Sequence, residues 1–221
     1  DGEDFTKGWQ IANELRVPMV DEHYYKPPQW FWEHLHRYDG YDRAKPKVYL
    51  GEYAAHDDHR RSTLRAALAE AACLTSLERN GDVVRLASYA PLLARRGHTQ
   101  WSPDLIYFNG TDVFPTISYE VQRLFGQNSG DMYLPTSISD SAEFAASTVR
   151  DSKSGDVILK LVNGANAPKP LHIGLNGVSP LPDGATLLTF QDVTDSVNVE
   201  RAMPDRAEAL EEADRMKVDF V

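Results

Sequence analysis

Short apolar runs alternate with longer amphipathic segments between residues 17 and 109, and this alternation constrains the fold more than any other feature. Three of the runs predict buried strands, at residues 17–25, 47–54 and 83–93, with a helix beginning near Pro28 after the first strand. Strands separated by helix-length segments are typical of β-α-β units on a parallel sheet. The sequence therefore predicts a β-α-β-α-β arrangement in this part of the chain.

The second intervening segment predicts a helix over residues 63–79. Ser62 is the expected N-cap, and Asn80-Gly81 suits the end of the helix because both residue types tolerate the left-handed conformation. Leucine and alanine recur at spacings of three and four, at Leu64, Leu68, Ala71, Leu74 and Leu77. This spacing predicts that one apolar stripe of the helix is buried.

After Gly126 the pattern changes to short alternating runs separated by turn residues. The runs predict antiparallel strands at 143–150, 156–163, 169–175 and 185–191, with turns at Ser154-Gly155, Asn176-Gly177 and Asp183-Gly184. The charged segment 205–217 fits a surface helix or a tail. We therefore expect two domains, an α/β domain over residues 1–125 and a β-sandwich over residues 126–221 with a charged tail.

The 221-residue chain carries 23 Lys+Arg against 33 Asp+Glu, a formal net charge of -10. Because no basic stripe offsets this charge, no nucleic acid partner is expected. No apolar run approaches the roughly 20 residues that cross a bilayer, so no membrane partner is expected. The acidic start is unlike a signal peptide, and secreted, periplasmic and cytoplasmic locations all stay open. The single cysteine, Cys73, excludes an internal disulfide and a cysteine-rich metal site.

Functional groups in a parallel β/α array gather where the strands end. The ends of the first two predicted strands carry His23, Tyr25 and Glu52. Glu52 closes an apolar run, where its burial would be costly without a partner, so it is either a functional carboxylate or a cap of the following turn. His23 and Tyr25 alternate along a strand and share a face, from which they could orient a neighbouring carboxylate.

Other candidate chemistry is less specific. The His-Asp-Asp-His run at residues 56–59 contains metal-ligand residue types, but a polar loop before a helix explains it better, so no metal is predicted. Trp30, Trp32 and Trp101 are either sugar-stacking platforms or core residues. The sequence has no Gly-x-Ser-x-Gly elbow, phosphate-binding glycine loop or dinucleotide fingerprint, so neither serine or thiol nucleophiles nor a cofactor is expected.

A series of motifs in fixed order covers residues 9 to 135. They are VDEHYY at 20–25 with Pro28 and Trp30-Phe31, GEYA at 51–54, AEAA at 69–72, LERN at 77–80, SYAPL at 88–92, Trp101, DLIYF at 104–108, Ser118-Tyr119 and VQRLF at 121–125. This series resembles the α-L-arabinofuranosidases of glycoside hydrolase family 51. Beyond residue 140 the resemblance is confined to sandwich-like alternation.

The resemblance implies a (β/α)8 TIM barrel followed by a β-sandwich, and cleavage of terminal arabinofuranosyl groups with retention of configuration. It implies that the three predicted strands are the sixth, seventh and eighth of the barrel, so that residues 1–125 form its C-terminal part. Glu52 would then be the nucleophile, and His23 and Tyr25 would orient it by hydrogen bonding. Three aromatic residues are the expected substrate contacts, with core packing as the alternative for each: Tyr53, Tyr89 and Trp101.

A retaining mechanism needs a second carboxyl group about 5–5.5 Å from the nucleophile. In the family this acid/base belongs to an Asn-Glu pair that ends the fourth barrel strand. The Asn13-Glu14 pair lies in a helix-like segment, residues 9–16, so the role is not transferred to it. We therefore expect a C-terminal portion that lacks the acid/base. Three barrel strands alone would expose an open edge and an apolar face, which predicts a companion N-terminal barrel segment or self-association, and the family resemblance also implies a homo-oligomer.

The preferred reading is a retaining enzyme that acts on arabinose-containing polysaccharide or oligosaccharide, such as arabinan or arabinoxylan. The tryptophans and the sandwich half keep a second class open, a non-catalytic carbohydrate-binding or interaction module. A related enzyme that cleaves β-glucan is a third alternative, because the residues at hand do not separate these sugars.

Overall fold

The computed structural model describes residues 2–139, 143–168, 170–174 and 186–191. Its helices are α1 (Glu3–Leu15), α2 (Pro28–Glu33), α3 (Leu64–Arg79) and α4 (Ile117–Gln127), with the short 3-10 helices η1 (Arg37–Gly40) and η2 (Asp58–Arg60). Its strands are β1 (Met19–Lys26), β2 (Lys47–Ala55), β3 (Val84–Tyr89), β4 (Leu93–Arg95), β5 (Ile106–Phe108), β6 (Val113–Pro115), β7 (Met132–Leu134), β8 (Phe144–Arg150), β9 (Val157–Asn163) and β10 (Thr186–Gln191).

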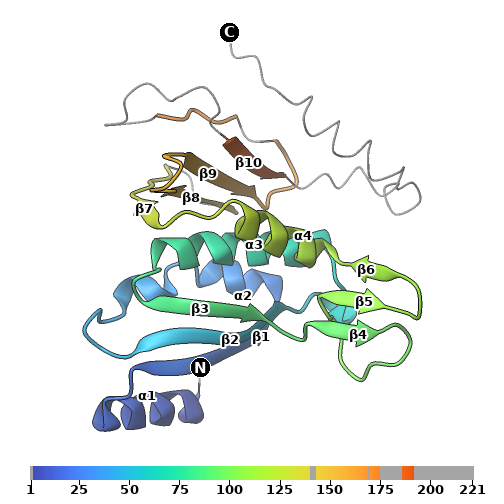
Figure 1. Ribbon diagram of the computed structural model, residues 1–221, viewed down its shortest axis with the longest axis horizontal. Coiled ribbons are helices and arrows are strands. Elements are labelled where there is room, and N and C mark those ends of the chain that lie inside the picture. Colours follow the sequence, from blue (N-terminus) through green and yellow to red (C-terminus); the bar gives the residue numbers. More distant parts are fainter. Residues whose placement is uncertain (1, 140–142, 169, 175–185, 192–221) are drawn as a thin grey trace.

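The predicted strands of the first half form a parallel sheet in the order β1-β2-β3, which confirms the β-α-β-α-β arrangement (Figure 1). Val48 and Leu50 of β2 are buried in the core that this sheet shares with the helices. The third strand is shorter than predicted. It ends at Tyr89, and Pro91, which has no N–H to donate to a ladder, separates it from β4.

The continuation of the chain forms a small sheet that the sequence did not predict. Its order is β4-β5-β6, with β4 and β5 parallel and β5 and β6 antiparallel. Leu93, which the sequence assigned to the third buried strand, begins β4 and is exposed. This sheet lies beside the end of β3 rather than extending the parallel sheet (Figure 1).

Helix α3 is buried on more than the one predicted stripe. Its cap is Thr63, whose hydroxyl accepts a hydrogen bond from the Ala66 amide at 3.1 Å, so the prediction of Ser62 is wrong by one residue. One side of the helix contributes Ala66 and Ala69 to the core against β2, while another contributes Ala67 and further small residues to a core with β8 and β9. Since alanine side chains are short, they allow close packing on both sides.

The second large sheet has the order β10-β9-β8-β7. The pair β8-β9 is antiparallel as predicted, and Gly155 adopts a positive φ of 86° in the predicted turn between these strands. Strand β7, which the sequence did not predict, also pairs antiparallel with β8. Strand β10 runs parallel to β9, so the prediction of antiparallel strands is wrong for this pair. Residues 170–174 have no strand structure, which contradicts the prediction of a strand at 169–175. The predicted turns at Asn176-Gly177 and Asp183-Gly184 and the segment 205–217 lie outside the described residues.

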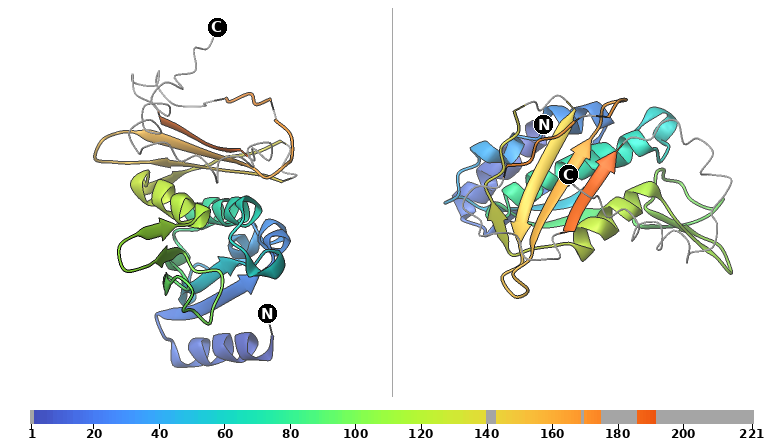
Figure 2. Two further views of the ribbon diagram at one scale, coloured as in Figure 1. Left: turned by 90° about the vertical axis from the view of Figure 1, so that its right-hand side faces the viewer. Right: turned by 90° about the horizontal axis from the view of Figure 1, so that it is seen from above.

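The described elements form layers (Figures 1 and 2). The β1–β3 sheet lies on one side of α2, α3 and α4, and the β7–β10 sheet lies on the other. Among the described residues, no helix combines the length and apolar character needed to span a membrane.

A buried ion pair connects α3 to the second sheet. The Lys160 ammonium group of β9 is fully buried and donates to the Glu78 carboxylate of α3, which also accepts from the Ser147 hydroxyl of β8. The same ammonium group lies 5.1 Å from the centre of the Phe125 ring of α4. The pair and its neighbours therefore join four elements, α3, α4, β8 and β9, at one point.

We expect Glu78→Gln to lower the free energy of unfolding by about 3 kcal/mol, because Lys160 would stay buried without its counter-charge. Urea unfolding measures this loss. The double variant Glu78→Gln/Lys160→Met should regain most of it, since no buried charge remains. Glu120→Gln, in the exposed pair with Arg123, is the control and should change stability by less than about 1 kcal/mol. A double variant no more stable than Glu78→Gln would contradict this account.

Candidate active site

The ends of β1 and β2 bring together the three residues that the sequence selected. In the parallel register His23 lies opposite Glu52. The Tyr25 hydroxyl donates to Glu52 Oε2 at 2.6 Å, and His23 Nδ1 lies 3.4 Å from the same oxygen. The Glu52 side chain is 43% exposed, so a molecule outside the sheet can reach it.

These side chains share one face of the sheet. Asp21, His23 and Tyr25 are exposed, whereas the intervening Glu22 and Tyr24 are buried, as alternation along a strand requires. Sequence reasoning did not single out Asp21, which contacts both His23 and the backbone before Glu52. Its Oδ2 lies 3.0 Å from His23 Nε2, and its Oδ1 accepts from the Gly51 amide at 3.1 Å.

The Tyr25 ring is held from its other side by the first residue of the loop after β2. His56 stacks on Tyr25, with ring centres 5.2 Å apart and an interplanar angle of 27°. Burial, with a smaller effect of Arg60, lowers the pKa of His56, which favours a neutral ring. Burial and the hydrogen bond to Glu52 raise the pKa of Tyr25, so its hydroxyl keeps the proton that it donates.

The three expected substrate contacts lie in different environments, and their roles stay predictions. Tyr53 is fully buried, donates to Gln122 Oε1 at 3.0 Å and packs against Tyr89, with ring centres 5.8 Å apart. Tyr89 is also buried, whereas Trp101 is 58% exposed in the loop between β4 and β5. In this arrangement only Trp101 presents a large open surface.

The opposite face of β1 carries a buried carboxylate that sequence reasoning did not single out. Glu22 is 3% exposed and is surrounded by hydrogen-bond donors from α1, β1, η1 and the residue after η1. The donors are Trp9 Nε1 at 2.9 Å, Tyr41 Oη at 2.9 Å, Tyr38 Oη at 3.1 Å and Tyr24 Oη. Burial and the Glu22 charge raise the pKa of all three tyrosines, so their hydroxyls stay protonated as donors.

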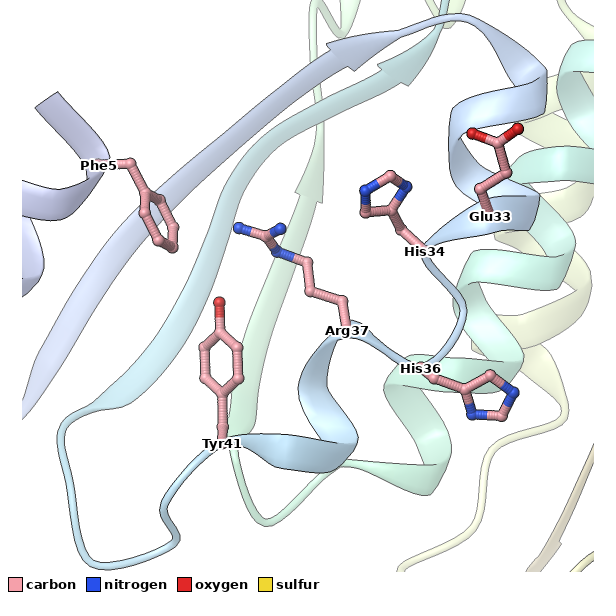
Figure 3. Close-up of a pocket in the computed structure, with 6 residues that line it drawn as sticks. All are labelled: Phe5, Glu33, His34, His36, Arg37 and Tyr41. Carbon is pink, nitrogen blue, oxygen red and sulfur yellow. The ribbon is translucent and has the colours of Figure 1, made fainter. Parts of the chain in front are cut away.

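A surface pocket with a volume of about 380 Å³ lies on this same helical side (Figure 3). It is lined by residues of α1, the α2–η1 segment and the residue that follows: Phe5, Glu33, His34, His36, Arg37 and Tyr41. The Arg37 guanidinium group lies 5.0 Å from the Phe5 ring centre, and Tyr41 donates to Glu22. The pocket thus belongs to the structural cluster around Glu22.

The loop at residues 56–59 supports the polar-loop interpretation. Asp57 accepts from the Thr63 hydroxyl at 2.5 Å and from the Arg65 guanidinium group. The hydrogen bond from Arg65 is the main effect that lowers the pKa of Asp57 to about 2. Within the described ranges, no group of three or more His, Cys, Asp or Glu side chains could hold a metal ion.

A second buried carboxyl group lies behind the end of β2. Glu70 of α3 is fully buried, and its Oε1 accepts from the Ala55 amide at 2.8 Å. Burial raises the pKa of Glu70 to about 7, against smaller lowering effects of Ser118, Ala55 and Tyr89. Glu70 thus fixes the backbone three residues after Glu52.

A comparison with known families matches most of the chain. The family model described as the α-L-arabinofuranosidase C-terminal domain matches residues 42–219. The match includes the charged segment near the end, which the sequence alone did not connect to the family. The chain therefore belongs to the α-L-arabinofuranosidases.

Individual relatives support the same assignment. An extracellular exo-α-L-arabinofuranosidase of Streptomyces chartreusis is 50% identical over 135 residues, which cover 61% of this chain and 16% of that protein. α-L-Arabinofuranosidase 1 of Arabidopsis thaliana is 36% identical over 165 residues, which cover 72% of this chain and 24% of that protein. The arabinose-bound structure of the MgGH51 α-L-arabinofuranosidase is 34% identical, with a TM-score of 0.68, and the match covers 72% of this chain and 28% of that one. The chain thus spans less than a third of the length of each of these proteins.

We expect the free energy of unfolding of Glu70→Gln to rise relative to that of the parent as the pH rises. The folded-state pKa of about 7 exceeds the ordinary value of 4.5, so the folded state binds more protons than the unfolded state between these values. In the parent, ionisation of Glu70 therefore lowers the free energy of unfolding as the pH rises through this window. The variant has no group at this position that can ionise, so it does not lose stability in this way. Relative to the parent, the variant should gain up to about 3 kcal/mol between pH 4 and pH 8, measured by urea unfolding. Glu33→Gln, on the exposed face of α2, is the control, and an equal difference at both pH values would contradict the assignment.

Proposed function

We propose that this chain is the C-terminal part of a retaining α-L-arabinofuranosidase, with Glu52 as the nucleophile. Its substrates would be arabinan or arabinoxylan, from which it would release terminal α-L-arabinofuranosyl residues. The observation that carries the proposal is the 2.6 Å hydrogen bond from Tyr25 to Glu52 at the end of two parallel strands. The names of the relatives and the arabinose bound to the MgGH51 structure support this substrate class.

The geometry suggests how Glu52 would act. Tyr25 and His23 both contact Oε2, which favours Oε1 as the oxygen that attacks the anomeric carbon. As the new C–O bond forms, the bond to the leaving oxygen breaks and a second carboxyl group gives that oxygen its proton. The second group, now ionised, takes a proton from water, whose oxygen attacks the anomeric carbon and releases Glu52.

The second carboxyl group belongs, in this proposal, to a region outside this sequence. Glu14, in the Asn-Glu pair, lies on α1 and accepts from Gln10 Nε2 at 2.8 Å, so it is not at a strand end. Residues 1–125 would supply the sixth to eighth strands of a TIM barrel, and residues 126–221 the C-terminal β-sandwich. The parallel β1–β3 sheet and the greater length of the relatives support this division.

The open face of the β1–β3 sheet supports a missing companion segment. Leu86 of β3 lies opposite Tyr49 of β2 and is 57% exposed, and a packed barrel interior would cover such a side chain. The companion would be an N-terminal barrel segment. The same exposed surface favours association of this chain with itself when that segment is absent.

A mechanism-based arabinofuranosyl label should add one sugar mass at Glu52 in a protein extended upstream to complete the barrel. Intact-mass analysis followed by peptide mapping measures this. The 221-residue chain alone should not be labelled, because substrate contacts and the acid/base would be missing. Glu52→Gln in the extended protein is the control. Labelling of neither protein would favour a non-catalytic carbohydrate-binding module, and full hydrolysis of natural arabinan by the 221-residue chain would contradict the missing acid/base.

In the extended protein, Tyr25→Phe should lower kcat about tenfold to a hundredfold with little change in KM. A hydrogen bond to a charged group contributes about 1.5–3 kcal/mol, and the stacked ring would keep its place on His56. Steady-state kinetics on an aryl arabinofuranoside tests this. Tyr133→Phe is the matched control, because the Tyr133 hydroxyl accepts from the Thr136 amide in the second sheet. Equal kcat values for the two variants would remove Tyr25 from the proposed role.

A further inference from the structure

The carboxylate of Asp21 makes two contacts next to Glu52. Its Oδ1 accepts from the amide of Gly51, the residue directly before Glu52, at 3.1 Å. Its Oδ2 lies 3.0 Å from Nε2 of His23, whose other ring nitrogen faces Glu52 Oε2 at 3.4 Å. One side chain therefore contacts the backbone that carries Glu52 and the imidazole that faces it.

The backbone at Gly51 needs an acceptor of this kind. In the pairing of β1 with β2, Glu22 lies opposite Leu50 and His23 lies opposite Glu52, so the register skips Gly51. The pairing of β2 with β3 is also interrupted between Leu50 and Tyr53. Backbone groups at such an irregularity lose their regular ladder partners. Asp21 supplies the acceptor for the Gly51 amide.

Only glycine leaves room for this contact. A Cβ atom on Gly51 would lie 2.1 Å from Asp21 Oδ1 and 2.8 Å from its Cγ. These separations are far shorter than any real contact, so the Asp21 carboxylate occupies the space that a side chain on residue 51 would take. Asp21 and Gly51 are thus a matched pair on neighbouring strands (Figure 1).

The contact with His23 also selects a proton position. A carboxylate oxygen accepts but does not donate, so the 3.0 Å approach is favourable when Nε2 carries a proton. The partner of one ring nitrogen fixes the orientation and the tautomer of an imidazole. Asp21 therefore holds the ring with Nε2 toward itself and Nδ1 toward Glu52 Oε2, and the second contact is a hydrogen bond when Nδ1 carries a proton as well.

We propose that Asp21 is a positioning residue that sets the nucleophile through two contacts, one to the Gly51 amide and one to the His23 ring. The proposal rests on the proposed function of Glu52 for its kinetic consequence. The protonation of the His23 ring does not depend on that function.

The test compares the parent with Asp21→Asn, which keeps the side-chain shape. If the amide oxygen continues to accept from Gly51, the amide NH2 group faces Nε2 of His23 and no longer favours a proton there. Nitrogen-15 NMR of the His23 ring in the 221-residue chain should show a proton on Nε2 in the parent and its loss from Nε2 in the variant. Asp82→Asn is the control, since Asp82 is exposed and pairs with Arg43.

The kinetic test uses the protein that is extended upstream to complete the barrel. We expect Asp21→Asn to lower kcat at least about tenfold with KM changed less than about threefold, by analogy with other sites where an Asp-to-Asn change alters a histidine tautomer. The unfolding temperature should stay close to that of the parent, which separates positioning from loss of folding.

Each outcome is decisive. A parent ring with its proton on Nδ1 alone, or a variant with unchanged ring protonation and unchanged kcat, would overturn the proposal. If Asp21→Asn does not fold, the parent NMR spectrum still tests it, and Gly51→Ala should displace Asp21 and change the same ring signals. If the parent shows neither turnover nor labelling at Glu52, the proposed function fails, while the NMR result still decides the role of Asp21.

Discussion

The burial of α3 between two sheets is the constraint on which the rest of the structure depends. One side of the helix packs against β2 and its neighbours, and another packs against β8 and β9. Short alanine side chains let both layers approach, so few positions on this helix could carry a larger residue without separating them. Two carboxyl groups of α3, the buried Glu70 and the partly buried Glu78, each bond to a different sheet. The helix therefore positions the strand ends that carry the candidate site relative to the second sheet.

The candidate site depends on an irregular stretch of β2 rather than on a regular strand. Where the ladder skips Gly51, the backbone turns Glu52 toward Tyr25 and His23, and Asp21 takes over the hydrogen bond that a regular strand would have made. Such bulges commonly redirect a side chain beside a functional site. The feature explains how a half-exposed carboxylate can follow directly on the buried residues of an apolar strand.

Periodicity predicted the parts of the fold that repeat. The strand at residues 47–54 and the helix over 63–79 follow from apolar spacing, and the site residues follow from the rule that function gathers at strand ends. The sequence could not predict β4–β6, because three-residue strands carry no period. It also placed the cap one residue early, at Ser62, since Ser and Thr adjoin and either can cap a helix.

Asp21 and Glu22 were both missed by sequence reasoning, and for the same reason. Asp21 and Glu22 are adjacent acids with no distinguishing pattern, yet one lies on the open face and the other is surrounded by aromatic donors. The difference arises from contacts across the sheet and with α1 and η1, which are far away in the sequence. Parallel pairing of β10 with β9 was missed for a similar reason, because strand direction depends on the path of the chain between them.

The two acids of β1 also make this strand intolerant of misalignment. A slip by one residue would move Asp21 and His23 into the tyrosine-lined interior and would expose Glu22 to solvent without its three donors from outside β1, Trp9, Tyr38 and Tyr41. A slip by one residue would therefore bury the charges that belong at the surface and expose the buried Glu22. The register that buries Glu22 also places His23 and Tyr25 beside Glu52, so the core behind β1 and the candidate site on its other face depend on the same strand alignment.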